Sequence, residues 1–258
     1  MRRTLRVLAL ALASVLAAPS LAAGPVDAAA LWQEAASANA AGELDRAAAA
    51  YRTLLDAGYI DVNVYYNLGN VYHQLGLMPH AILAWRRGAE LAPRDPDLMA
   101  NLDFVRRSTV DGVYAPDPEP WFAPWQSALS VAEGVWLGAG LTGLGLVLLG
   151  LRRRGPETSA VGLGLLALLV GGLVFMGAWV RQGLPPVAVM LVDELKVTSD
   201  LGGGVELFVL HAGAEVSVVE AAAGRLLIAL PDGRRGWALE SAMGRVDARS
   251  AMPELPAR

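Results

Sequence analysis

Two long apolar segments without a charged residue constrain the fold of this 258-residue chain more than any other feature. As helices, residues 134–151 and 160–180 would be about 27 Å and about 31 Å long. Each is long enough to cross a hydrocarbon core of about 30 Å. The chain is 54% hydrophobic and only 18% charged, whereas soluble domains carry about a quarter charged residues. The sequence therefore predicts a transmembrane hairpin of two helices.

The segment between the two spans, residues 152–159, begins with Arg152, Arg153 and Arg154. Short loops rich in arginine stay in the cytoplasm. We therefore expect these arginines to determine the topology, with both flanking regions on the outer face of the membrane. The many glycines of the spans indicate close packing of the two helices. The absence of charge inside either span argues against a proton or ion pathway.

Residues 1–23 have the three-part layout of a secretory signal. A basic start is followed by the apolar run 7–18, which is too short to span a bilayer comfortably. Ser20 and Ala22 place small side chains where a peptidase that cuts after Ala22 needs them. An uncleaved anchor is the alternative. A secretory signal would place the N-terminal region on the outer face of the membrane, which is the topology that the arginine loop also indicates.

Residues 24–107 are rich in alanine and repeat with a period of about 34 positions, which is typical of tetratricopeptide repeats. The two copies align Leu31 with Tyr65, Ala35 with Gly69, Gly42 with Gly76, Ala47 with Ala81, and Tyr51 with Trp85. The second copy resembles the tetratricopeptide family over residues 62–95, through Tyr65, Leu68, Gly69, Tyr72, Ala81, Trp85 and Pro93. The first copy, residues 28–61, matches the pattern less closely.

The pattern of the second copy has a physical reading. Gly69 and Ala81 are small where two helices would cross closely, and Tyr72 and Trp85 would fill the space between them. Residues 96–105 predict one further helix, which would act as the closing cap that such stacks need. Because stable stacks usually have at least three repeats, we expect additional support from a partner, a second copy or the membrane.

In the tetratricopeptide family, the first helix of each repeat lines a groove that holds protein segments. The resemblance implies a protein-binding groove formed by Trp32, Asn39, Asn63, Tyr66, Asn70 and His73. Asn70 can both donate to and accept from a ligand backbone. The alternative is that Tyr66 and His73 are ordinary exposed residues of a polar face. Members that bind C-terminal carboxylates use lysine and arginine, so Trp32, Tyr66 and Phe104 argue against that specificity.

Residues 108–133 predict a linker rich in proline and tryptophan. Four prolines between residues 116 and 124 make it stiff and extended. Trp121, Phe122 and Trp125 follow shortly before the first span, and such rings favour the headgroup layer. We expect them to be membrane-interface anchors. Packing against the repeat domain is the alternative.

Residues 186–247 change to short β-branched runs separated by turns, which predict a small all-β domain before a tail at 248–258. Five strands are expected at residues 187–190, 205–210, 214–219, 226–230 and 236–238. Asp232-Gly233 is a strong hairpin signal.

This segment resembles bacterial SH3-like domains through Lys196–Ser199, Leu210–Gly213, Val216–Val218 and Leu230–Trp237. That family often recognises cell-wall peptides or protein segments. Arg225-Leu226 replaces the tryptophan usual before the fourth strand, which puts wall binding in doubt.

The composition argues against several other functions. A net charge of −4 gives no basic stripe for nucleic acid. The chain has no cysteine, and His73, His80 and His211 are scattered. No strained nucleophile elbow or phosphate-cradling loop is present. We therefore expect neither an enzyme nor a bound metal or cofactor.

The order of a signal, a tetratricopeptide stack, a two-helix hairpin and an SH3-like domain resembles the BatE-type membrane proteins of bacterial aerotolerance operons. The segments Tyr66–Tyr72, Ala81–Trp85 and Asn101-Leu102 add to the likeness. The resemblance implies a scaffold in the bacterial inner membrane with both soluble domains on the periplasmic face. Its partners would be membrane proteins with von Willebrand A-type domains and a MoxR-type ATPase. The alternative is a module that binds peptidoglycan through the SH3-like domain.

Overall fold

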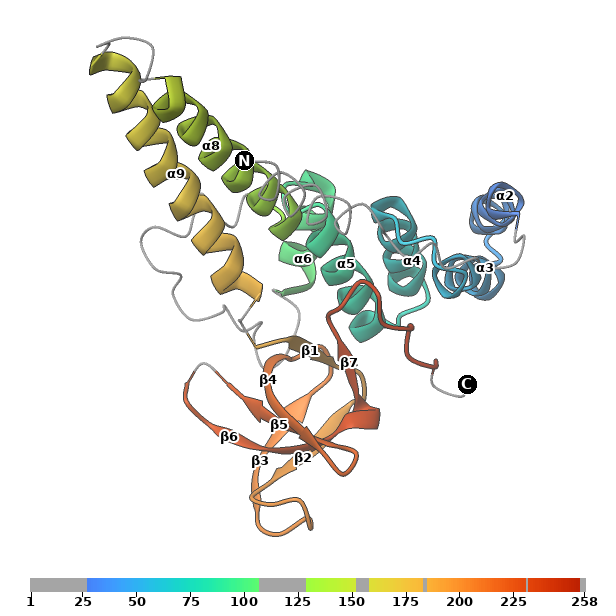
Figure 1. Ribbon diagram of the computed structural model, residues 1–258. Helices are drawn as coiled ribbons and strands as arrows, with labels where there is room; N and C mark the ends of the chain where they lie inside the picture. Colours follow the sequence, from blue (N-terminus) through green and yellow to red (C-terminus); the bar gives the residue numbers. More distant parts are fainter. Residues whose placement is uncertain (1–26, 107–128, 152–157, 183–184, 231, 256–258) are drawn as a thin grey trace.

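The structure, a computed structural model, describes residues 27–106, 129–151, 158–182, 185–230 and 232–255. Within these ranges the chain forms seven α-helices and one antiparallel sheet of seven strands (Figure 1). The predicted signal, the anchors Trp121, Phe122 and Trp125, and the arginines at 152–154 lie outside the described residues. Those expectations stay predictions.

The N-terminal part consists of five helices, each packed against the next in chain order. They are α2 (Ala28–Ala40), α3 (Leu44–Asp56), α4 (Val62–Gln74), α5 (Met78–Leu91) and α6 (Pro96–Arg106). The start of α2 is capped by the Asp27 carboxylate and that of α4 by the Asp61 carboxylate. Gly42 and Gly76 follow α2 and α4, each with a φ of +76°, which only glycine adopts without strain. The two helix pairs therefore turn in the same way.

The close helix crossing predicted at Gly69 is confirmed. A Cβ atom on Gly69 would overlap the indole of Trp85, so only glycine lets α4 and α5 approach this closely. The Trp85 indole N–H donates a hydrogen bond of 3.2 Å to the carbonyl of Tyr66. Ala81 and Tyr72 are fully buried beside them.

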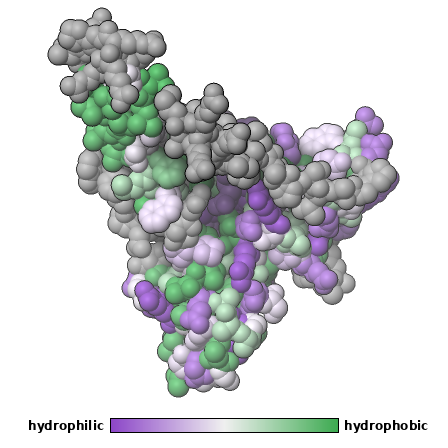
Figure 2. Space-filling view, in the orientation of Figure 1, coloured by the Kyte–Doolittle hydropathy of each residue, from purple (hydrophilic) through white to green (hydrophobic). Residues whose placement is uncertain are grey.

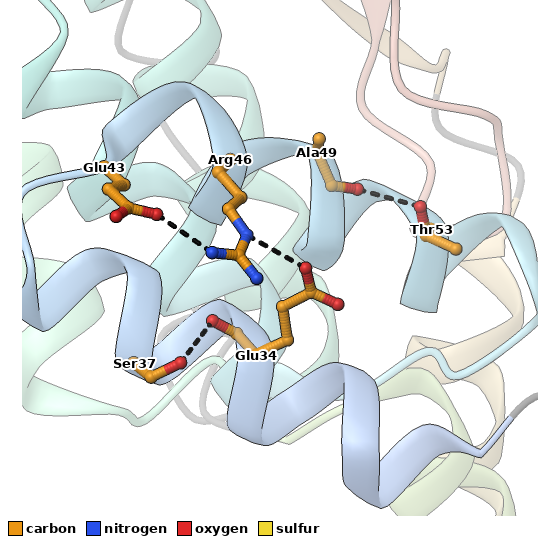
Figure 3. A network of polar contacts seen from close by, with 6 residues as sticks. All are labelled: Glu34, Ser37, Glu43, Arg46, Ala49 and Thr53. Carbon is orange, nitrogen blue, oxygen red and sulfur yellow. Dashed lines mark hydrogen bonds and ion pairs between the residues drawn. The ribbon is translucent and has the colours of Figure 1, made fainter.

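A polar network on the outside of α2 and α3 joins these helices (Figure 3). Arg46 bonds Glu34 and Glu43 at 3.0 Å each, and Ser37 and Thr53 bond backbone carbonyls of their own helices. Exposed ion pairs add little to stability. The pairing of α2 with α3 therefore depends mainly on the small residues buried between them, Ala35, Ala38, Ala47 and Ala48.

The next two helices, α8 (Val131–Leu151) and α9 (Thr158–Gln182), form an antiparallel hairpin. Each contains 20 residues long and apolar enough to cross a membrane, with mean hydropathy of 1.6 and 2.3. Only 17% and 28% of these windows are buried, unlike the core helix of a soluble protein. Figure 2 shows apolar surface on the outer part of the hairpin.

Glycines bring α8 and α9 together. A Cβ atom at Gly138, Gly145 or Gly171 would overlap backbone atoms of the facing helix. The exposed apolar side chains include Leu146, Leu163, Leu169, Phe175 and Trp179. Small residues therefore face inward and large ones outward, as in helices that pack within lipid.

The first of these helices begins at Val131, three residues before the predicted span, inside the predicted linker. Ser130 and Glu133 explain the difference, because they form a capping box. The Glu133 N–H donates to the Ser130 hydroxyl at 3.2 Å, and the Ser130 N–H donates to the Glu133 carboxylate at 2.8 Å.

The C-terminal sheet has the strand order β3-β2-β6-β5-β4-β1-β7. The strands are β1 (Val187–Met190), β2 (Glu194–Thr198), β3 (Glu206–His211), β4 (Glu215–Ala222), β5 (Arg225–Ala229), β6 (Arg235–Leu239) and β7 (Met243–Arg245), with a 3₁₀ turn at Glu240–Ala242. The five predicted strands are present, but β2 and β7 were not predicted. β2 alternates polar and apolar residues only over the four positions Glu194–Val197, and β7 has only three residues, so both gave short signals.

The short helical stack has a support that was not predicted, namely the chain's own C-terminal segment. Residues 246–255 leave β7 and run along α5 and α4 (Figure 1). Val246, Ala248 and Met252 are buried in the same apolar cluster as Tyr65 and Trp85. Part of the region predicted as a separate tail therefore completes the core of the helical domain.

Candidate protein-binding site

Three of the predicted groove residues lie on one face of α4, at the helical spacing of Tyr66, Asn70 and His73. The final helix of the stack, α6, adds Asn101 and Phe104 to this face. The Asn101 amide N–H donates to the Asn70 side-chain oxygen at 3.1 Å. The rings of His73 and Phe104 meet edge to face, with centroids 5.9 Å apart. We call these five residues the α4–α6 face.

The α4–α6 face combines polar groups with an exposed aromatic ring. Phe104 is 62% exposed, which is unusual for a phenylalanine that packs only against its own domain. His73 is exposed as well and lies 6.0 Å from the indole of Trp85. Such a surface offers apolar contact from Phe104 and hydrogen bonds from His73 and the asparagines. The α4–α6 face therefore offers both apolar and polar contacts on one surface.

The other three predicted groove residues have local partners. Trp32 is half-buried and packs edge-on against Tyr51 of α3, at 5.7 Å between centroids. Asn63 is exposed, and its amide donates to Asp61 at 3.0 Å within the cap of α4. The Asn39 side-chain oxygen is buried without a hydrogen-bond partner. No hydrogen bond or ring contact between described residues joins these three to the α4–α6 face.

A second polar site, which the sequence reasoning missed, surrounds Arg87 of α5. Its side chain is 1% exposed, and its guanidinium donates to the carbonyls of Arg245 at 2.8 Å, Ser250 at 2.8 Å and Ala251 at 3.3 Å. Burial lowers the pKa of Arg87. The sequence did indicate that this arginine is buried, because Arg87 follows the apolar Ala84 and Leu83 by three and four residues and so lies on the same side of the helix. A charge on a buried stripe needs partners.

Two further side chains extend this site along the C-terminal segment. Arg52 of α3 donates to the Pro253 carbonyl at 2.7 Å, and the Tyr65 hydroxyl donates to the Ala248 carbonyl at 2.5 Å. We call Arg52, Tyr65 and Arg87 the tail site. Arginine and tyrosine on three helices thus bind one irregular segment.

The helical domain also contacts the sheet itself. Arg86 of α5 forms an ion pair of 2.9 Å with Glu215 of β4, whose side chain is 3% exposed. A Cβ atom on Gly244 of β7 would overlap Leu83 of α5, so these backbones lie close. The two domains therefore share a packed interface.

No family model, curated protein or solved structure matches this chain. No cluster of three or more histidine, aspartate or glutamate side chains suited to a metal occurs within the described ranges.

Proposed function

We propose that this protein is a membrane-anchored scaffold whose helical domain binds segments of partner proteins at the α4–α6 face. The observation that carries the proposal is the exposed Phe104 ring beside His73 and the Asn70–Asn101 pair. An exposed aromatic flanked by hydrogen-bonding groups is typical of the anchor positions of protein interfaces.

The contacts between the domains support the anchored arrangement. The helical domain precedes the hairpin in sequence and the sheet follows it, yet Arg86 and Arg87 bind the sheet and the segment after it. A hairpin that crosses a membrane twice between packed domains leaves both on the same side. Arg94, at the turn before α6, also pairs with Glu133 in the first turn of α8 at 2.7 Å. The pair is exposed and adds little stability, but it places the end of α5 beside the start of the hairpin.

Features of the sequence support this proposal for the side of the membrane and for the partners. The arginine loop and the signal indicate the periplasmic face of a bacterial inner membrane. The likeness to BatE-type proteins indicates membrane proteins with von Willebrand A-type domains and a MoxR-type ATPase, in a complex linked to stress or aerotolerance. Confinement to one membrane raises the effective concentration of such partners, so weak contacts at the α4–α6 face suffice.

The test is recovery of these partners from detergent-solubilised bacterial membranes with wild-type protein and with the H73A/F104A variant. Met99 lies on the same helix as Phe104 and is also exposed, so M99A is the matched control. Wild type and M99A should recover the same von Willebrand A-type proteins, and H73A/F104A should lose them. Equal recovery by all three would place binding elsewhere. Retention on purified cell-wall sacculi instead would favour the peptidoglycan-binding alternative.

A further inference from the structure

The C-terminal segment lies on the helices as a bound peptide lies on a receptor. After the Val246 N–H, which donates to the Val187 carbonyl of β1 at 2.7 Å, its described residues belong to no strand, and buried and exposed residues nearly alternate along it. Val246, Ala248 and Met252 are buried, whereas Asp247, Arg249, Ala251 and Glu254 are exposed. One side of the segment therefore faces the helices and the other faces outward.

The tail site recognises this segment mainly through its backbone. Arg52, Tyr65 and Arg87 all donate to main-chain carbonyls. Every polypeptide presents such carbonyls, so these bonds do not depend on the side chains of residues 246–255. The side chain of Met252 adds selectivity, because it is 5% exposed and its sulfur lies 3.1 Å from Arg87 Nη1. Methionine adapts readily to irregular apolar space.

The segment leaves polar groups near the tail site unsatisfied. The Tyr72 hydroxyl and both ring nitrogens of His80 are buried and form no hydrogen bond of close geometry. The two rings lie 5.6 Å apart; the Glu254 backbone of the segment is the nearest polar group to His80, and Arg52 is close enough to act on both rings. Buried polar groups without partners are unfavourable. A different segment with a polar side chain at this point would bind the same site more completely.

We propose that the tail site is a second peptide-binding site, occupied in cis by residues 246–255 and open to exchange with an extended segment of a partner protein. The partner segment presents main-chain carbonyls to the three donors, an unbranched apolar side chain at the place of Met252, and a polar group near His80. This inference does not depend on partner binding at the α4–α6 face.

The first experiment uses the absence of cysteine from the chain. Ala248 is 6% exposed and Ala251 is exposed, so A248C and A251C introduce one thiol each at matched places in the segment. In full-length protein in detergent, A248C should react with a maleimide at least about tenfold more slowly than A251C. This ratio corresponds to a free energy for releasing the segment equal to about one net hydrogen bond or more. Adding R87A should remove that difference.

The second experiment tests exchange. A fluorescent peptide of residues 246–258 should bind a chain ending at Arg245 at least about tenfold more tightly than the R87A version of that chain, by the same reasoning. Intact protein should bind this peptide more weakly than the shortened chain, because its own segment occupies the site at high effective concentration. If the shortened chain loses its helical circular dichroism, excess unlabelled peptide should instead accelerate labelling of A248C.

Two outcomes would overturn the proposal. If A248C reacts as fast as A251C in the wild-type background, residues 246–255 do not occupy the site. If the peptide neither binds the folded shortened chain nor accelerates labelling of A248C, the segment is a permanent part of the core and not an exchangeable ligand.

Discussion

Arg86 of α5 and Glu215 of β4 form an ion pair of 2.9 Å across the boundary between the helical domain and the sheet. Their environments differ, since the Arg86 side chain is 23% exposed and that of Glu215 only 3%. Loss of one partner therefore has unequal consequences. Arg86 without Glu215 can turn toward water, whereas Glu215 without Arg86 remains a buried, unpaired carboxylate.

We expect R86A to lower the free energy of unfolding by about 3 kcal/mol and E215Q by about half of that. Urea unfolding in a constant detergent background measures both. The exposed Arg46 provides the control, because R46A removes the ion pairs with Glu34 and Glu43 and should leave stability almost unchanged. If R86A and E215Q cost the same, the argument from unequal burial is wrong.

The hairpin should respond to substitutions at its inner glycines and not at its outer ones. At Gly138 a side chain would overlap the backbone of α9, whereas at Gly140 nothing lies within 4 Å. G138I should therefore separate α8 from α9, and G140I, two residues away, should not. Crosslinking between single cysteines introduced into the two helices reports their separation. Equal crosslinking in both variants would contradict the packing described above.

Acidification should weaken the fold through His80. Burial lowers the pKa of His80 below its ordinary value of 6.5, so the folded chain disfavours the protonated ring. Above that value neither folded nor unfolded chain holds the proton, and the effect is absent. As the pH falls below 6.5, His80 becomes protonated in the unfolded chain but stays neutral in the folded chain. The free energy of unfolding then decreases by at most about 1.4 kcal/mol per pH unit.

Urea unfolding at pH 7.5 and pH 5.5 checks this, with H80F as the comparison. Phenylalanine fills the same apolar surroundings beside Tyr72 without a titrating group. The difference in stability between the two pH values should be smaller in H80F than in wild type. An identical difference would assign the pH dependence to carboxylates elsewhere.

Reporter fusions that are active only outside the cytoplasm test the topology. Fusions after Arg107 and after Arg258 should be active, and a fusion within residues 152–159 should be silent. The packed interface of Arg86, Glu215 and Arg87 requires the first two fusions to behave alike. Opposite activities at the two ends would mean that only one apolar helix spans the membrane.

The sequence predicted local structure well where a periodic pattern was present. Gly69 indicated a close crossing of two helices, and the apolar runs indicated two long helices. The contacts between domains were not predictable in this way. Arg87 donates to main-chain carbonyls of Arg245 and Ala251, which lie 158 and 164 residues later in the chain. Every residue has a main-chain carbonyl, so no sequence pattern marks such partners.

The same limit applies to the binding face. The spacing of Asn70 and His73 predicted that both lie on one helix, and both are part of α4. The contributions of Asn101 and Phe104 depend on how α6 packs beside α4, which tertiary contacts decide. Trp32 and Asn63, which were also expected in the groove, contact Tyr51 and Asp61.

The bond between Tyr65 and the Ala248 carbonyl joins positions 183 residues apart. It has a consequence for the order in which the protein is made. The helical domain is among the first parts to be synthesised, yet Arg87 and its apolar core remain uncovered until residue 252 has left the ribosome. Contacts of such long range form late. The N-terminal domain therefore stays incomplete throughout translation and membrane insertion, and a prematurely terminated chain would leave Arg87 and the apolar residues beside it exposed.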